Sequence, residues 1–314
     1  MNIYIIGHKS PDLDAVASAV QYADFLKKAK RFEGSKIIPL RAGEPNIETK
    51  YVFDKFDVEM PQSMDDVEIN AEDAIVLVDH NEEAQRHEKI VGDQVIEIVD
   101  HHKINVSFTT PVRIDVRPVG STSTVVYKLF DMYGLTPSEK TQSLILAGIL
   151  SDTVGLKSST TTGIDSDIAR DISEKLDIDV EKFTFEIFKA KSDLSSLTPI
   201  EIAKKDFKVF DFEGTKVFVN QVETVEPEKA IEQKKDLVEA LEEAKTQEEA
   251  SHGYIVVTDI LKINSQVIYT NDVEKEIIEK AFTTEGEDNV ADIGPRMSRK
   301  KDITPPIEKV ILGN

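Results

Sequence analysis

Short apolar runs alternate with longer amphipathic segments along the first half of the chain. Runs of strand length occur at Asn2–Gly7, Lys36–Leu40, Ala74–Val78 and Val95–Val99. Apolar residues at helical spacing predict helices at Ala15–Ala29, Ser121–Tyr133 and Ser138–Leu150. The last two helices each begin with a serine that can cap them. Strands that alternate with helices predict an α/β domain, a doubly wound parallel sheet covered on both faces.

The pattern changes at K-A-K-S-D-L-S-S-L-T-P, Lys189–Pro199, a polar and serine-rich stretch that predicts a linker. Beyond it, strands are predicted at Phe207–Phe212, Lys216–Val222, Tyr254–Asp259 and Gln266–Tyr269, with one long acidic helix at Pro227–Glu249. The acidic run Glu239–Glu249 is expected to be the solvated face of that helix. We therefore expect an N-terminal domain at 1–188, a linker at 189–199, and a smaller mixed-sheet α/β domain at 200–314.

Composition narrows the function classes. The chain has 314 residues, a formal net charge of −21 and no cysteine. The absence of cysteine excludes disulfides and thiolate chemistry, so any metal must be held by histidines and carboxylates. The negative charge disfavours binding to nucleic acids and anionic membranes. No apolar run approaches the roughly 20 residues of a membrane span, and no basic, cleavable leader precedes Asn2, so we expect a cytoplasmic protein.

Histidines and aspartates follow the predicted strands and one helix. They occur in G-H-K-S-P-D-L-D-A (His8, Asp12, Asp14), V-L-V-D-H-N-E (Asp79, His80), V-D-H-H (Asp100, His101, His102) and L-S-D-T (Asp152). Taken singly, an aspartate here could be a helix cap or a turn residue. Ligands collect at the carboxyl ends of the strands in open α/β sheets, so we expect these side chains to share one site.

So many carboxylates in one cleft are unfavourable unless cations neutralise them. Imidazole ligands beside carboxylates shift the preferred ion from Mg²⁺ toward Mn²⁺, Co²⁺ or Zn²⁺. We expect Mn²⁺ first and Co²⁺ next, as two ions that share a carboxylate. A pair of ions about 3.5–4 Å apart is typical of phosphoryl hydrolysis.

A basic run, M-S-R-K-K-D-I at Met297–Ile303, is unusual in so acidic a chain. It could be an ordinary surface patch. Alternatively it could hold a phosphate, with Arg299 offering a bidentate fork and Lys300 a point charge. Lys208, in K-D-F-K-V-F, could add a third cation.

These motifs together resemble those of the DHH phosphoesterase superfamily. The S-R-K-K run and the rest of the C-terminal pattern resemble the family II, manganese-dependent inorganic pyrophosphatases, over about Asn2 to Pro305. Other branches of the superfamily, the RecJ-like nucleases and the phosphodiesterases, usually carry a G-G-G-H motif. This chain has no Gly-Gly pair, which counts against those branches.

The resemblance implies two Mn²⁺ ions per subunit, bridged by Asp79. The first ion would have the ligands His8, Asp12 and Asp79, and the second Asp14, Asp79, His101 and Asp152. His102 would contact the substrate phosphate or transfer a proton, and Asp100 would orient an imidazole. The distal phosphate would be held by Arg299, Lys300 and Lys208.

The implied reaction is hydrolysis of inorganic pyrophosphate to two orthophosphates. A water that bridges both metals would lose its proton and attack phosphorus, in a cleft between the domains that closes about the linker. The resemblance also implies Co²⁺ as a substitute ion, Mg²⁺ accompanying the substrate, and a homodimer formed by the N-terminal domain. The alternatives are a DHH-type exopolyphosphatase, a phosphodiesterase acting on short oligonucleotides, and a metal or phosphate sensor without catalysis.

Overall fold

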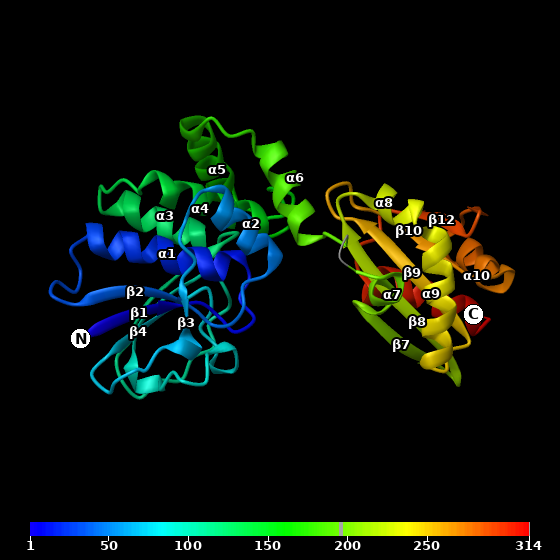
Figure 1. The fold of residues 1–314 in the computed structure, drawn as a ribbon, viewed down its shortest axis with the longest axis horizontal. Coiled ribbons are helices and arrows are strands. Elements are labelled where there is room, and N and C mark those ends of the chain that lie inside the picture. Colours follow the sequence, from blue (N-terminus) through cyan, green and yellow to red (C-terminus); the bar gives the residue numbers. More distant parts are fainter. Residues whose placement is uncertain (195–196, 314) are drawn as a thin grey trace. The chain divides into compact units, whose positions relative to one another are not determined.

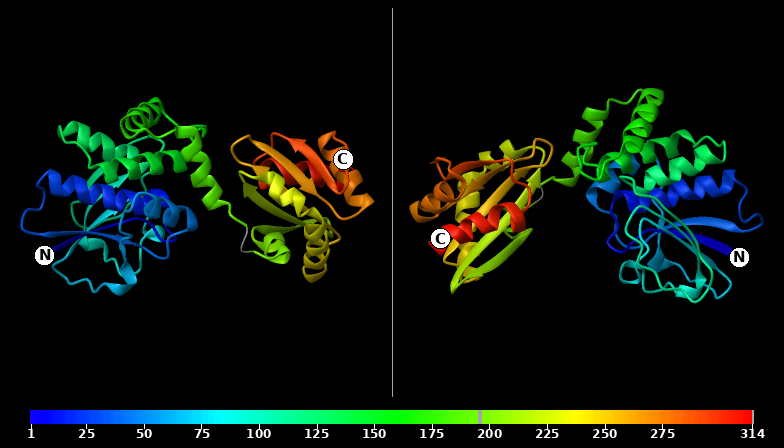
Figure 2. Two further views of the ribbon diagram at one scale, coloured as in Figure 1. Left: turned by 45° about the horizontal axis from the view of Figure 1, so that its top comes forward. Right: turned by 180° about the vertical axis from the view of Figure 1, so that it is seen from behind.

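The computed structural model describes residues 1–194 and 197–313. The chain divides into two compact units, Met1–Lys191 and Ser192–Asn314. Each unit is built around a six-stranded sheet of its own. Figure 1 and the two further views in Figure 2 show each sheet with the helices of its unit.

The sheet of the first unit is entirely parallel. Its strands are β1 (Asn2–Ile6), β2 (Lys36–Arg41), β3 (Gln62–Ser63), β4 (Ala74–Val78), β5 (Val95–Asp100) and β6 (Arg113–Val116). Their spatial order is β3-β2-β1-β4-β5-β6. All of β4 is buried, because it lies between β1 and β5 and is covered on both faces. The predicted parallel sheet is confirmed.

Helices of the first unit cover one face of this sheet (Figure 1). They are α1 (Leu13–Lys28), α2 (Ile47–Lys55), α3 (Thr122–Met132), α4 (Glu139–Asp152), α5 (Gly163–Leu176) and α6 (Val180–Lys191). On this face Phe25 of α1 and Phe130 of α3 belong to one buried cluster with Ile5. The opposite face, with Leu77 and Ile98, is covered chiefly by loops and short 3₁₀ turns rather than by long helices.

Side-chain caps set the starts of two helices as the sequence predicts. Ser121 accepts the N–H of Thr124 at the start of α3, and Ser138 accepts the N–H of Thr141 at the start of α4. Both predicted caps are confirmed. The sequence analysis did not predict α2, α5, α6, β3 or β6.

The second unit contains a mixed sheet, as predicted. Its strands are β7 (Phe207–Phe212), β8 (Thr215–Thr224), β9 (His252–Asp259), β10 (Asn264–Ile268), β11 (Gly286–Glu287) and β12 (Val290–Gly294). Their order is β11-β12-β10-β9-β8-β7. Among the pairs of described strands in this second sheet, only β8–β9 is parallel.

Helices cover both faces of the second sheet (Figure 2). They are α7 (Pro199–Lys204), α8 (Pro227–Glu232), α9 (Lys234–Gln247), α10 (Asp272–Phe282) and α11 (Thr304–Ile311). Alternate residues of β8 face opposite sides, as a strand requires: Val217 packs in the cluster with α10 and α11, and Phe218 in the cluster with α7 and α9.

The prediction of one helix over Pro227–Glu249 is wrong. The helix is interrupted at Gln233, whose N–H bonds the carbonyl of Ala230, three residues back, instead of continuing the four-residue pattern. Glu239, Glu242 and Glu243 of α9 are exposed, as expected for a solvated face.

The predicted linker, residues 189–199, overlaps helical structure at both ends. Lys191 is the last residue of α6 and Pro199 the first of α7, where Thr198 and Glu201 form a capping box. Residues 195–196 of that linker, and residue 314 of the predicted second domain, lie outside the described residues. None of the helices in the described part of the chain is long and apolar enough to cross a bilayer.

Candidate metal centre

Three neighbouring strands of the first unit bring the histidine and aspartate motifs to one edge of the sheet. His8 follows β1, Asp79 follows β4, and His101 follows β5, and these strands are adjacent in the order β1-β4-β5. Because the strands are parallel, all three side chains lie at their carboxyl ends, where α/β proteins bind ligands. Asp152, the last residue of α4, is added from the helical layer.

His8, Asp12 and Asp79 form the first cluster, with one ligand atom of each within 4.8 Å of the others. His8 Nε2 lies 3.5 Å from Asp12 Oδ2 and 3.5 Å from Asp79 Oδ2. Asp12 also caps α1, because its Oδ1 accepts the N–H of Ala15 at 3.0 Å. The two interpretations of Asp12, as a cap and as a member of the cluster, are therefore compatible: each uses a different oxygen.

Asp14, Asp79, His101 and Asp152 form the second cluster, again with ligand atoms within 4.8 Å of one another. His101 Nε2 lies 3.5 Å from Asp79 Oδ1 and 3.6 Å from Asp152 Oδ2. Asp79 belongs to both clusters and presents a different oxygen to each histidine. Its backbone has φ of 59°, a left-handed conformation that aspartate tolerates better than most residues.

The carboxylates of the second cluster oppose one another electrostatically. Burial and the charge of Asp14 raise the pKa of Asp152 well above its usual value, and burial and Asp79 raise the pKa of Asp14. Burial also opposes ionisation of Asp79, but the imidazoles of His101 and His8 outweigh it and lower the pKa of that carboxyl. A bound cation would relieve this repulsion by favouring the charged form of every carboxylate.

The two histidines present their Nε2 atoms in the way a metal ligand requires. The carbonyl of Val119 lies 3.0 Å from His101 Nδ1, and that of Lys9 lies 2.8 Å from His8 Nδ1. Because a carbonyl only accepts, Nδ1 carries a proton in each ring, so Nε2 is the nitrogen that would bind a metal, after giving up any proton it shares with the carboxylates. His101 Nε2 is buried and has no hydrogen-bond partner among the described residues. Imidazole and carboxylate donors in this arrangement fit Mn²⁺.

His102 differs from its neighbour in exposure and partner. Its side chain is 51% exposed, and its Nδ1 lies 2.9 Å from Asp100 Oδ1. The fully buried Asp100 also accepts the backbone N–H groups of His101 and His102, at 2.7 and 3.1 Å. Asp100 thus orients the exposed imidazole, and the carbonyl of Val119 orients the buried one.

The sequence analysis did not predict that the segment which leads into and begins α3, Val119–Thr124, takes part in the site; we term it the α3 entry segment. The backbone N–H of Thr122 binds Asp14 Oδ2 at 2.6 Å, and both the N–H and the hydroxyl of Ser123 bind Asp14 Oδ1. The Thr122 hydroxyl binds Asp79 Oδ1 at 2.9 Å. A capped helix start predicts free N–H donors for an anion, but the sequence does not say which anion they bind.

Comparisons with known proteins agree with this geometry. The family model for the DHH family, N-terminal domain, matches residues 2–149, and that for the DHHA2 domain matches residues 185–310. A manganese-dependent inorganic pyrophosphatase of Methanocaldococcus jannaschii is 37% identical over 99% of both chains. The chain belongs to the manganese-dependent inorganic pyrophosphatases. A second pyrophosphatase of this kind, from Methanothrix thermoacetophila, is 36% identical over 98% of this chain and 97% of its own.

Solved structures place the manganese-dependent pyrophosphatase family in the same fold. A crystal structure from Methanococcus jannaschii, assigned to the family II inorganic pyrophosphatases, has a TM-score of 0.60 and 37% identity, and the match covers 98% of each chain. An exopolyphosphatase-related protein from Bacteroides fragilis has a TM-score of 0.52 at 17% identity and covers 100% of this chain and 94% of its own. At that identity the second likeness shows the fold alone.

The second unit contains the cations that the sequence analysis proposed to hold phosphate, Arg299, Lys300 and Lys208. Both terminal nitrogens of the Arg299 guanidinium donate to Asp206, Nη1 to its carbonyl at 2.6 Å and Nη2 to its Oδ1 at 2.9 Å. Asp206 directly precedes β7, which contains the exposed Lys208. Lys300 is exposed and has no ion-pair partner among the described residues. Arg299 therefore lies near the end of β7 that carries Lys208.

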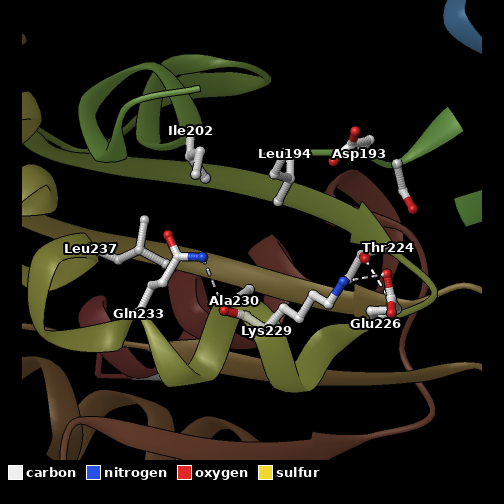
Figure 3. Close-up of a pocket in the computed structure, with 10 residues that line it drawn as sticks. Asp193, Leu194, Ile202, Thr224, Glu226, Lys229, Ala230, Gln233 and Leu237 are labelled. Atoms are coloured by element: carbon white, nitrogen blue, oxygen red, sulfur yellow. Dashed lines mark hydrogen bonds and ion pairs between the residues drawn. The ribbon is translucent and has the colours of Figure 1, made fainter. Parts of the chain in front are cut away.

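A separate, partly open pocket of the second unit, with a volume of about 100 Å³, lies between α7, the end of β8 and α8 (Figure 3). Ile202, Ala230 and Leu237 form its apolar wall. The cation that lines it, Lys229, is paired with Glu226 at 3.0 Å. With two carboxylates, Asp193 and Glu226, beside its one cation, the lining of this pocket does not suit a polyanion such as pyrophosphate.

Proposed function

We propose that this chain hydrolyses inorganic pyrophosphate to two orthophosphates at a centre of two Mn²⁺ ions. The observation that carries the proposal is the pair of carboxylate–imidazole clusters that share Asp79. A carboxylate shared between two clusters is suited to hold two ions close together. The names of the full-length relatives, which are manganese-dependent inorganic pyrophosphatases, support both the substrate and the metal.

Each ion would take the side chains of one cluster as its ligands. The first ion would be held by His8, Asp12 and Asp79, and the second by Asp14, Asp79, His101 and Asp152. When bound, the two ions supply Lewis-acid catalysis, because they neutralise phosphate oxygens and lower the pKa of the attacking water. Co²⁺ is the expected substitute because its ligand preferences are similar, and Mg²⁺ is expected to accompany the substrate.

Side chains of the protein would bind the phosphate groups. The exposed imidazole of His102, oriented by Asp100, would donate to a phosphate oxygen or return a proton to the leaving phosphate. Arg299 would offer a bidentate fork and Lys300 a mobile point charge, with Lys208 as a third cation. The first unit would thus supply the metal ligands and the second the cations that stabilise developing charge on the leaving group.

Reconstitution with metal tests this function. The chain is freed of metal with a chelator, and Mn²⁺, Co²⁺, Mg²⁺ or Zn²⁺ is added back. Phosphate release is then measured from pyrophosphate, from longer polyphosphates and from a chromogenic phosphodiester. We expect Mn²⁺ to restore the fastest hydrolysis and pyrophosphate to be the preferred substrate. Absence of pyrophosphate hydrolysis with Mn²⁺ would refute the proposal, and faster release from polyphosphates or the diester would favour the corresponding alternative enzyme.

We also propose that the chain forms a homodimer through its first unit. Strand β6 pairs only with β5 among the described strands, and Ile114 on β6 is 39% exposed. An edge strand with an exposed apolar residue is a template for pairing with a second copy. Light scattering of Ile114→Glu should show a monomer, whereas Ile47→Glu, a change at an exposed position of α2, should leave the dimer intact. A dimeric Ile114→Glu variant would contradict this interface.

A further inference from the structure

Asp165 is a fully buried carboxylate near the start of α5. One of its roles is local. Its Oδ2 accepts the backbone N–H of Thr162 at 2.7 Å and the Thr162 hydroxyl at 2.6 Å, which completes a capping box. A cap needs only these bonds and is normally made near solvent, so capping alone does not explain the complete burial of the charge.

The same carboxylate also binds both sides of the α3 entry segment. The N–H of Gly120 lies 2.9 Å from Oδ2 and 3.1 Å from Oδ1 of Asp165, and the hydroxyl of Thr124 lies 2.6 Å from Oδ1. Gly120 is required for this approach, because a Cβ there would lie 2.8 Å from Asp165 Oδ2 and 2.6 Å from Thr153 Cγ2. Charge-assisted hydrogen bonds to a buried carboxylate are short and strong, so Asp165 fixes this backbone firmly.

The position of the α3 entry segment determines how three side chains of the metal clusters are oriented. As described above, it binds Asp14 and Asp79, and its carbonyl at Val119 fixes the ring of His101. Its glycine also packs against Thr153, directly after Asp152. A small shift of this one segment would therefore move several metal-binding groups together.

We propose that Asp165 is a positioning residue of the manganese centre: it touches no metal ligand itself but holds the α3 entry segment that orients Asp14, Asp79 and His101. The proposal rests on the proposed function. Partners of metal ligands typically contribute about 10–100-fold to metal affinity. Because Asp165 acts one step further from the ions, we expect the lower end of that range.

The test compares Asp165→Asn with Thr162→Ala. The first change removes the negative charge and replaces one carboxylate oxygen by an amide NH₂, so in either orientation of the amide Gly120 N–H loses one of its two acceptors and the remaining bonds to the α3 entry segment are no longer charge-assisted. The second change removes the hydroxyl of the α5 cap and keeps the bonds to the α3 entry segment. Calorimetric titration of the metal-free chain with Mn²⁺ gives the Kd, and thermal unfolding gives the loss of stability.

We expect Asp165→Asn to raise the Kd for Mn²⁺ about tenfold, and excess Mn²⁺ to restore much of its pyrophosphate hydrolysis. Thr162→Ala should lower the melting temperature while its Kd stays within about twofold of the unsubstituted chain. An unchanged Kd in Asp165→Asn would overturn the inference and leave Asp165 as a cap. An equal rise in Kd in both variants would overturn it too, because loss of the cap would then suffice.

A second variant covers the case in which Asp165→Asn does not fold. Thr124→Val removes one of the two links to the α3 entry segment and keeps the buried carboxylate. Its Kd should rise about threefold, and an unchanged Kd would overturn the inference. The unsubstituted chain separates this result from failure of the proposed function. If the unsubstituted chain binds no Mn²⁺, both the proposed function and the inference fail. If it binds Mn²⁺ and the Kd of the variant is the same, only the inference is refuted.

Discussion

Gly148 lies in the middle of α4, where the absence of a side chain leaves room for the groups that hold Asp14. A Cβ built at this position would lie 2.5 Å from Asp14 Oδ1 and 3.1 Å from Ser123 Cβ, and it would overlap the Ser123 hydroxyl. All these atoms are buried, so none can move into solvent. Gly148→Ala therefore forces either α4 away from α1 or the Asp14 carboxylate out of its hydrogen bonds.

The competing free energies can be compared. Alanine in a helix interior is favoured over glycine by about 1 kcal/mol. Overpacking a buried site costs about 1–3 kcal/mol, and loss of a hydrogen bond to the buried Asp14 carboxylate costs about 1.5–3 kcal/mol more. The unfavourable terms are larger, so Gly148→Ala should lower the free energy of unfolding by about 1–3 kcal/mol in total after partial relaxation. For a unit of this size that corresponds to a fall of about 2–12 °C in Tm.

The assay pairs thermal unfolding with Mn²⁺ calorimetry. Because the displaced group is a proposed ligand, the Kd for Mn²⁺ should rise about tenfold or more. Gly163→Ala is the matched control, since a Cβ at Gly163, the first residue of α5, would meet no atom within 4 Å. That variant should be as stable as the unsubstituted chain or slightly more stable, with unchanged Mn²⁺ affinity. If Gly148→Ala also gained stability and bound Mn²⁺ normally, the steric reasoning would be refuted.

Three further predictions concern the shared carboxylate, the basic run and acid stability. Asp79→Ala should abolish pyrophosphate hydrolysis and weaken both Mn²⁺ sites in one titration; loss of a single site would contradict the shared ligand. Lys300→Ala should leave Mn²⁺ binding unchanged and lower kcat with pyrophosphate. The control, Lys301→Ala, should keep kcat and KM within about twofold of the unsubstituted chain. Equal effects of the two changes would argue against a specific role for Lys300. Burial opposes ionisation of Asp73, but the N–H groups of Asn2 and Asn70 outweigh burial and lower the pKa of this carboxyl. The ionised Asp73 therefore stabilises the fold above the unfolded pKa of about 3.9, and this stabilisation is lost as the pH falls through the lower folded pKa. Asp73→Asn should therefore lower the free energy of unfolding at pH 7 by about 1 kcal/mol, a difference that urea titrations should find shrinking below about pH 3.9; a constant difference would refute the assignment.

The elements that could be predicted from the sequence are those whose signal is local. The run Ala74–Val78 is continuous and apolar because β4 is buried on both faces, and its bounds were predicted as the structure has them. Strand β6 was missed, since an edge strand is covered less completely and its sequence, R-I-D-V, is half charged. The break at Gln233 was missed because glutamine is an ordinary helix residue.

The candidate site likewise contains residues with a local sequence signal and residues whose role depends on the tertiary fold. His8, Asp79 and His101 could be grouped because each follows an apolar strand, and the parallel sheet brings strand ends together. The backbone N–H groups of the α3 entry segment left no trace in the sequence, because every residue except proline carries one. Asp165 had a readable signal as the fourth residue of T-G-I-D, a capping-box spacing, but its link to Gly120 depends on the tertiary fold.

The order of the ligands along the chain has a consequence for biosynthesis. The two clusters draw on His8 through Asp152, whereas the phosphate-binding cations proposed for the second unit begin at Lys208. A ribosome adds about 5–20 residues per second from the N-terminus, so the complete ligand set is synthesised seconds before the first of these cations. Under the proposed assignment, the nascent chain therefore carries its manganese ligands before it carries the groups proposed to hold pyrophosphate, which would separate metal loading from substrate binding in time.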